Sequence, residues 1–80
     1  MIDVDRSGPA APPRRNGELV FEAPWEGRAF GMAVALLQHH GLGWEDFRCH
    51  LVAAIARRPD AAYYEHFVDA LAALGERLAR

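Results

Sequence analysis

The sequence predicts an all-α fold, a small bundle of about three helices with an extended, irregular N-terminal arm. After residue 24 the large apolar side chains recur three and four positions apart, which is the spacing of one helix face. Residues 1–17 hold three prolines and two glycines but few large apolar side chains, so they bury too little surface to offset their ordering entropy. We therefore divide the chain into a flexible Pro/Arg-rich arm, 1–17, and a helical domain, 18–80.

The third helix is the element around which we expect the bundle to form. From Tyr63 to Leu78 one apolar seam repeats at helical spacing, and Asp60, after Pro59, is the expected N-cap. The seam consists of Tyr64, Phe67, Leu71, Leu74 and Leu78. A second, smaller face carries Tyr63, His66, Ala70 and Ala73, which suits close approach by another surface.

Two further helices precede it. The first is expected from Pro24, which fits the first helical turn, to about His40, with Gly41 as a left-handed cap. The second is expected from Trp44 to about Arg57. Its inward stripe is Phe47, Leu51 and Ile55.

Composition limits the classes of function. Eighty residues with a single cysteine, Cys49, form a thin core without disulfides, and such domains usually need a metal or a partner subunit. The longest apolar run, 32–37, is far shorter than a membrane span, and no signal peptide is evident, so we expect a cytoplasmic protein with no membrane partner. The net charge of −2 and the scattered arginines favour no nucleic-acid partner.

Few residues offer chemistry by themselves. Neighbouring His39 and His40 point about 100° apart on a helix and have no third ligand at suitable spacing, so we expect no metal there. Cys49 is expected to be an ordinary buried thiol. Arg48 is either an exposed arginine that pairs with Glu45 or Asp46, or a guanidinium aimed at an anionic group of another chain. No motif of an independent enzyme is present, so any catalytic role requires an assembly.

Four separated blocks carry a family resemblance, and they are Val20–Glu26, Ala29–Phe30, Trp44–Arg48 and Tyr63–Phe67. Their order and spacing resemble the N-terminal helical part of nitrile hydratase β subunits, over about residues 18–78. Two relatives share this helical module. They are the accessory proteins that help to load cobalt into nitrile hydratase, and the corresponding subunit of thiocyanate hydrolase.

The resemblance implies roles for four residues. Arg48 takes the place of an arginine that reaches the α-subunit metal centre and hydrogen-bonds its oxidised cysteine ligands, whose anionic oxygens suit a planar cation. Tyr63 and His66 match residues of the substrate pocket and its surrounding network, and Phe67 stands in that pocket where the family often has tryptophan. Accessory proteins generally lack an arginine at the Arg48 place, which favours the catalytic subunit.

The resemblance also implies cofactor and partners. Cobalt or iron would be held by a cysteine motif of the α subunit, which is absent here, so we expect no metal and no cofactor bound by this chain. A full β subunit continues into a β-rich domain, whereas this chain ends at Arg80. We therefore expect a separate β-rich subunit beside the α subunit, in a hetero-oligomer built from three chains.

Two functions follow from these expectations. The first is a small β-type subunit of a nitrile hydratase, a lyase that hydrates a nitrile to an amide, inactive as a single chain. The alternative is a non-catalytic accessory protein, a metallochaperone or activator that binds the α subunit, or the equivalent subunit of a thiocyanate hydrolase.

Overall fold

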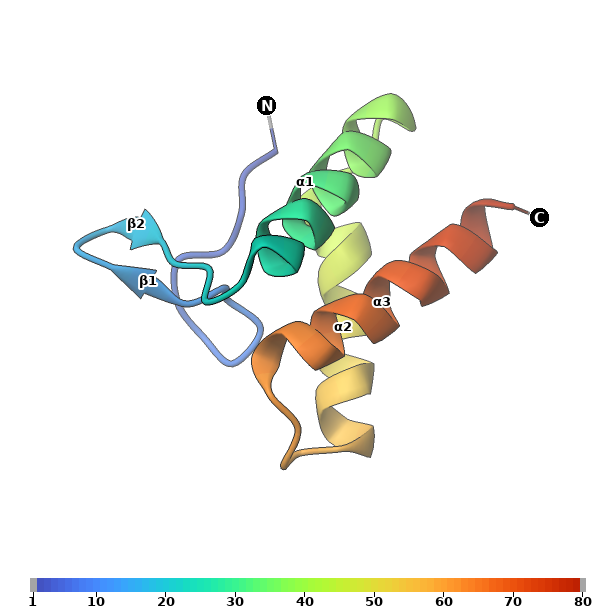
Figure 1. Ribbon diagram of the computed structural model, residues 1–80. Coiled ribbons are helices and arrows are strands. Elements are labelled where there is room, and N and C mark those ends of the chain that lie inside the picture. The colour runs from blue at the N-terminus through green and yellow to red at the C-terminus, as the bar shows by residue number, and fades with distance from the viewer. Residues whose placement is uncertain (1, 80) are drawn as a thin grey trace.

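The computed structural model describes residues 2–79, which form three helices and one two-stranded antiparallel sheet (Figure 1). The helices are α1, Pro24–His39, α2, Trp44–Arg57, and α3, Tyr63–Leu78. Strand β1, Arg14–Arg15, pairs with β2, Glu18–Leu19. The predicted all-α bundle is confirmed, because the sheet contains only two residues in each strand.

The helix ends follow local chemistry. Pro24 opens α1, and Gly41 has the positive φ of +66° expected of a left-handed cap. The predicted N-cap of α3 is wrong, because α3 is preceded by Ala62 and no side chain caps it. The N–H of Ala61 instead donates to the carbonyl oxygen of Arg58, so Pro59 and Asp60 are the central residues of a β-turn.

The core lies where α2 and α3 pack together, with α1 against both. Phe67 is completely buried, with ring centroids 4.7 Å from Phe47, 5.2 Å from Tyr64 and 6.0 Å from Phe30. The predicted α3 seam is confirmed. Its Tyr64, Phe67 and Leu74 are buried, and Leu71 and Leu78 pack partly buried against the same cluster.

The segment before α1 is irregular, as predicted, and it lies against the helices (Figure 1). Ala10 is 4% exposed, and Ile2 and Val4 pack on the core. The hairpin turn between β1 and β2 is Asn16–Gly17, both with positive φ, which is the combination that favours a type I′ turn. The predicted flexibility of residues 1–17 stays a prediction.

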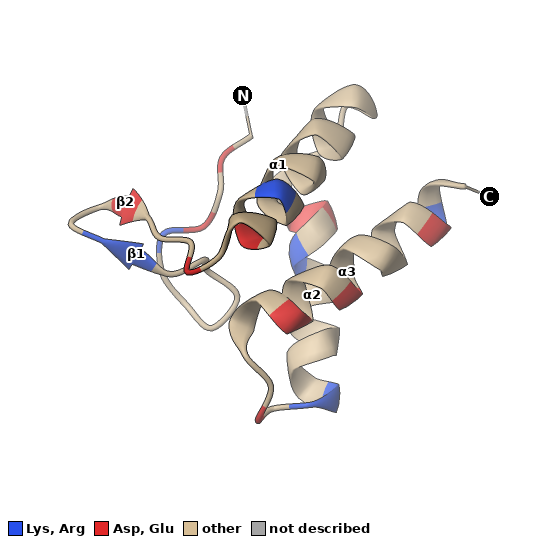
Figure 2. Ribbon diagram, in the orientation of Figure 1, with Lys and Arg blue, Asp and Glu red and all other residues tan. Residues whose placement is uncertain are grey.

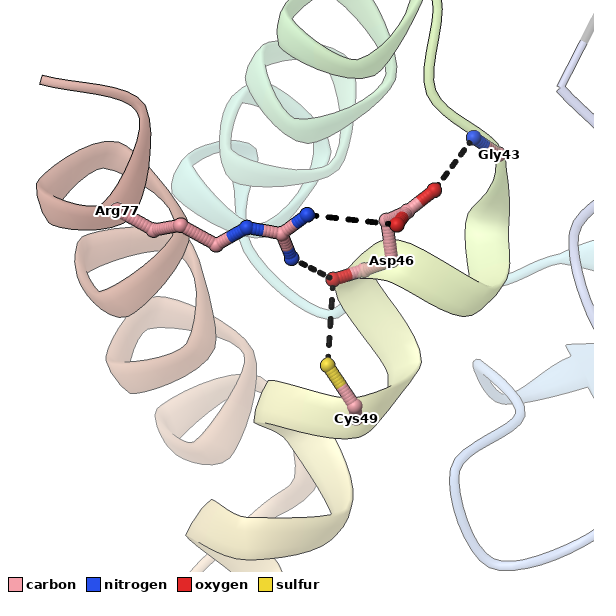
Figure 3. A network of polar contacts seen from close by, with 4 residues as sticks. All are labelled: Gly43, Asp46, Cys49 and Arg77. Atoms are coloured by element: carbon pink, nitrogen blue, oxygen red, sulfur yellow. Dashed lines mark hydrogen bonds and ion pairs between the residues drawn. The ribbon is translucent and has the colours of Figure 1, made fainter. Parts of the chain in front are cut away.

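Asp46, in the first turn of α2, contacts both Gly43 and Arg77 (Figure 3). Its Oδ2 accepts the Gly43 N–H at 3.0 Å, which satisfies one free donor at the helix start. Its Oδ1 lies 3.5 Å from Nη2 of Arg77, near the end of α3. Cys49, expected to be buried, is instead exposed, with its Sγ 3.4 Å from the Asp46 carbonyl oxygen.

Among residues 2–79, no helix is both long enough and apolar enough to cross a membrane.

Candidate functional site

Arg48 lies on the exposed side of α2 and bonds to the N-terminal arm. Its Nη1 lies 3.0 and 3.2 Å from the two carboxylate oxygens of Asp5. Of the two interpretations of Arg48, the pairing with Glu45 or Asp46 is therefore wrong, because Arg48 pairs with Asp5 of the arm instead. Nη2 and Nε take no part in this ion pair, and the Arg48 side chain remains 44% exposed.

Tyr63, the first residue of α3, also bonds to the arm. Its hydroxyl donates to the carbonyl oxygen of Ala10 at 2.9 Å. Burial raises the Tyr63 pKa well above its usual value, and the neighbouring Tyr64 and the negative charge of Asp5 add to the rise. Tyr63 is thus a neutral hydrogen-bond donor at neutral pH, within electrostatic reach of the carboxylate that holds Arg48.

The other two predicted site residues lie deeper. His66 is 3% exposed, and its Nδ1 has no hydrogen-bond partner among residues 2–79. The ring of Phe67 is completely buried, 6.1 Å from that of Tyr63. Both side chains therefore lie in the interior of this chain. Their roles in a substrate pocket stay predictions.

The arm connects Arg48 and Tyr63, which lie on different helices. Asp5 and Ala10 are only five positions apart, and they contact Arg48 and Tyr63 respectively. We call the surface formed by Arg48, Tyr63, Asp5 and Ala10 the arm-covered surface. Released from the arm, it would offer a planar cation and a neutral phenol, which together suit anionic or carbonyl oxygens.

Sequence reasoning did not find Asp5 or Ala10. The arm has no periodic pattern, and an ion pair between residues 43 positions apart leaves no local signal. The arm holds two acids, Asp3 and Asp5, and no local pattern marks either one as the partner of Arg48. Two glutamates near Tyr64, described below, were missed for the same reason.

The described residues suit a supporting part of a site better than a complete one. A guanidinium and a phenol can bind and orient a partner's groups, but neither supplies an activated nucleophile. No group of three or more His, Cys, Asp or Glu side chains among residues 2–79 is placed to hold a metal ion. The structure is thus a small helical domain whose surface offers a guanidinium and a phenol as binding groups.

Comparison with protein families identifies which kind of domain this is. Residues 4–78 match the family described as "Nitrile hydratase beta subunit, N-terminal", and the chain belongs to this family. The resemblance of the four sequence blocks is thereby confirmed, and membership implies a hetero-oligomer with an α subunit. Searches of curated proteins and of solved structures found no significant match.

Proposed function

We propose that this chain is a small β-type subunit of a heteromeric nitrile hydratase, which adds water to a nitrile to give an amide. The observation that carries the proposal is the family match over residues 4–78, together with an exposed arginine at position 48. The metal, cobalt or iron, would be held by the α subunit and would supply the Lewis-acid chemistry there. A separate chain would supply the β-rich part of the assembly.

Arg48 is the residue through which this chain would act on the partner's site. Its guanidinium is planar and permanently charged, so it can donate two parallel hydrogen bonds to anionic sulfenate or sulfinate oxygens. The Asp5 carboxylate offers Nη1 the same kind of acceptor within the chain. The pair supports the proposal by its chemistry, because it places two carboxylate oxygens around this guanidinium.

Tyr63 would donate its phenol proton to a substrate or partner oxygen in place of the Ala10 carbonyl. Its raised pKa keeps that proton on the oxygen at neutral pH. His66 and Phe67 would hold Tyr63 from within the core, since both are buried on the same helix turn.

The alternative is a non-catalytic accessory protein that holds the α subunit during metal insertion. One observation favours it, namely that Arg48 already has an intrachain partner and so needs no second chain to explain its position. In that case the chain would be absent from the finished enzyme. A thiocyanate hydrolase subunit would use the same surface with a different substrate.

Arg48→Lys separates these functions. Lysine keeps the charge but lacks the planar fork, so a catalytic subunit should lose roughly 10- to 100-fold in turnover per bound metal. The measurement compares reconstituted complexes at equal metal occupancy. Arg57→Lys, at the exposed end of the same helix, is the matched control and should leave turnover unchanged.

Unchanged turnover per metal in Arg48→Lys would rule out the catalytic role. Slower cobalt incorporation with normal final turnover would instead identify the accessory protein. Loss of assembly in Arg48→Lys, but not in Arg57→Lys, would show that Arg48 binds the α subunit rather than supporting its chemistry.

A further inference from the structure

A second candidate site lies between the hairpin, the start of α1 and the start of α3, and Tyr63 and Tyr64 are part of it. It is a cavity of about 200 Å³. Its lining consists of Pro13, Val20, Glu22, Glu26, Ala62, Tyr63 and Tyr64. The lining contains two carboxylates and no basic side chain, and Figure 2 shows these acidic residues in the turn before α1 and in its first turn.

Tyr64 is the unusual member of this lining. It is 4% exposed, and its hydroxyl is buried with no hydrogen-bond partner among residues 2–79. An unpaired buried hydroxyl is costly, so most such groups in proteins have a partner. Burial, and then the negative charge of Glu26, raise the Tyr64 pKa to about 12, and both residues line the cavity.

One of the two carboxylate oxygens of Glu26 already accepts a hydrogen bond within the chain. Its Oε1 accepts the Glu22 N–H at 2.7 Å. Glu26 lies in the first turn of α1, where the helix dipole also favours a negative charge. Oε2 takes no part in that bond. One acceptor oxygen of Glu26 and the whole carboxylate of Glu22 therefore remain for a ligand.

Aromatic rings complete the site. The rings of Tyr63 and Tyr64, both in the lining, meet edge to face with centroids 5.0 Å apart. Aromatic faces attract cations, and carboxylates and a phenol oxygen accept hydrogen bonds from them. A cationic ligand would pair with these carboxylates, whereas an anionic ligand would be repelled by them.

We propose that this cavity binds a guanidinium or ammonium group, held by Glu22, Glu26 and the Tyr64 hydroxyl. The group is either a side chain of a partner subunit or a free organic cation. Neither Arg48 nor Asp5 lines this cavity, and Tyr63 is the one residue that it shares with the arm-covered surface.

The test titrates the full-length, ¹⁵N-labelled chain with Nα-acetyl-L-arginine amide (arginine amide below). The neutral, nearly isosteric control is Nα-acetyl-L-citrulline amide (citrulline amide below), which has no α-ammonium group. Arginine amide should shift the backbone signals of residues 20–26 and 62–64, and citrulline amide should not. Glu26→Gln keeps an oxygen for the Glu22 N–H but removes the charge, so it should weaken arginine amide by about tenfold or more. Glu18→Gln, an exposed carboxylate outside the cavity, should bind like the wild type.

Tyr64→Phe distinguishes a ligand site from a merely buried hydroxyl. Removing an unpaired hydroxyl should leave the melting temperature of the free chain unchanged or higher, and it should still weaken arginine amide binding. Equal shifts with citrulline amide, or binding unaffected by both Glu26→Gln and Tyr64→Phe, would overturn the proposal.

The assembled complex identifies the source of the cation. If a partner side chain fills the cavity, arginine amide should bind the free chain but no longer the complex with the α subunit. If a free cation is the natural ligand, the complex should bind arginine amide as well. The titration of the free chain requires no partner, so its result does not depend on the proposed nitrile hydratase function.

Discussion

The helical core and the N-terminal arm are held by different forces. In the core, the completely buried Phe67 lies among the rings of Phe47, Tyr64 and Phe30, and its stability comes from apolar area removed from water. The arm has small apolar contacts through Ile2, Val4 and Ala10, and two polar contacts. Those polar contacts fall on two of the residues for which we propose a function.

The difference teaches which part of the molecule can exchange partners. A buried aromatic ring has no equivalent environment in water, whereas an exposed ion pair can be replaced by another ion pair at little cost. The Asp5–Arg48 pair, with side chains 22% and 44% exposed, is of the exchangeable kind. We therefore expect the arm to leave Arg48 and Tyr63 when the α subunit binds, while the core keeps its packing.

The strongest way to test this comparison is to truncate the centre of the core. Phe67→Ala should lower the free energy of unfolding by about 3–5 kcal/mol, because it removes a fully buried ring and leaves a cavity. A core of this size supplies little more than that, so the variant should be largely unfolded at 37 °C. Chemical denaturation followed by circular dichroism measures the change.

Val68→Ala is the control for that loss, because Val68 is the next residue of the same helix and is 43% exposed. It should change stability by less than about 1 kcal/mol. Equal losses in the two variants would show that the core is not organised around Phe67.

Phe67 also shows how far the sequence predicted the fold. The spacing of Tyr64, Phe67 and Leu74 specified the buried seam of α3 correctly, because helical periodicity is a local property. The N-cap prediction failed at Asp60, since Pro59–Asp60 suits a β-turn as well as a helix start. His66 and Ala70, on the face expected to suit close approach by another surface, are buried within the chain, and a helix pattern alone does not tell which neighbour covers such a face.

The candidate site was less predictable, since it depends on contacts between distant residues. Arg48 and Tyr63 were found from their chemistry and their place in a family pattern. Their arm contacts, Asp5 and Ala10, have neither periodicity nor motif. A carboxylate in a proline-rich segment offers no sequence signal until the fold brings it beside a guanidinium.

An alkaline titration gives a smaller, pH-dependent effect at the boundary between core and arm. The pKa of Tyr64 is raised to about 12 and that of Tyr63 is also raised, so above pH 10 the unfolded chain loses protons that the folded chain keeps. The stability from both tyrosines is fully present below pH 10, and the Tyr64 part is lost as the pH rises through about 12.

Denaturation midpoints measured between pH 8 and pH 12 should therefore fall above pH 10. Tyr64→Phe should make this fall shallower, because phenylalanine does not titrate. A midpoint that falls equally in wild type and variant would mean that Tyr64 ionises normally in the folded state. The same result would mean that the negative charge of Glu26 does not raise the Tyr64 pKa.

The smallest expected change in stability is at the arm itself. Tyr63→Phe removes the donor to the Ala10 carbonyl, and because the arm can turn that carbonyl to water, unfolding should cost only about 1 kcal/mol less. The arm should be loosened more than the whole chain is destabilised, since the arm loses one of its two polar contacts with the helices. Trypsin should therefore cleave after Arg14 and Arg15 faster than in the wild type, with little change in melting temperature.

Arg77→Gln is the matched control, because it breaks an exposed ion pair with Asp46 that does not involve the arm. It should change stability by at most about 1 kcal/mol and leave cleavage after Arg14 and Arg15 unaltered. Binding of the α subunit should protect these bonds in the wild type if residues 1–17 become ordered against the partner. Equal cleavage in the free chain and the complex would contradict an arm that moves from Arg48 and Tyr63 onto the partner, and would leave it as a permanent cover of that surface.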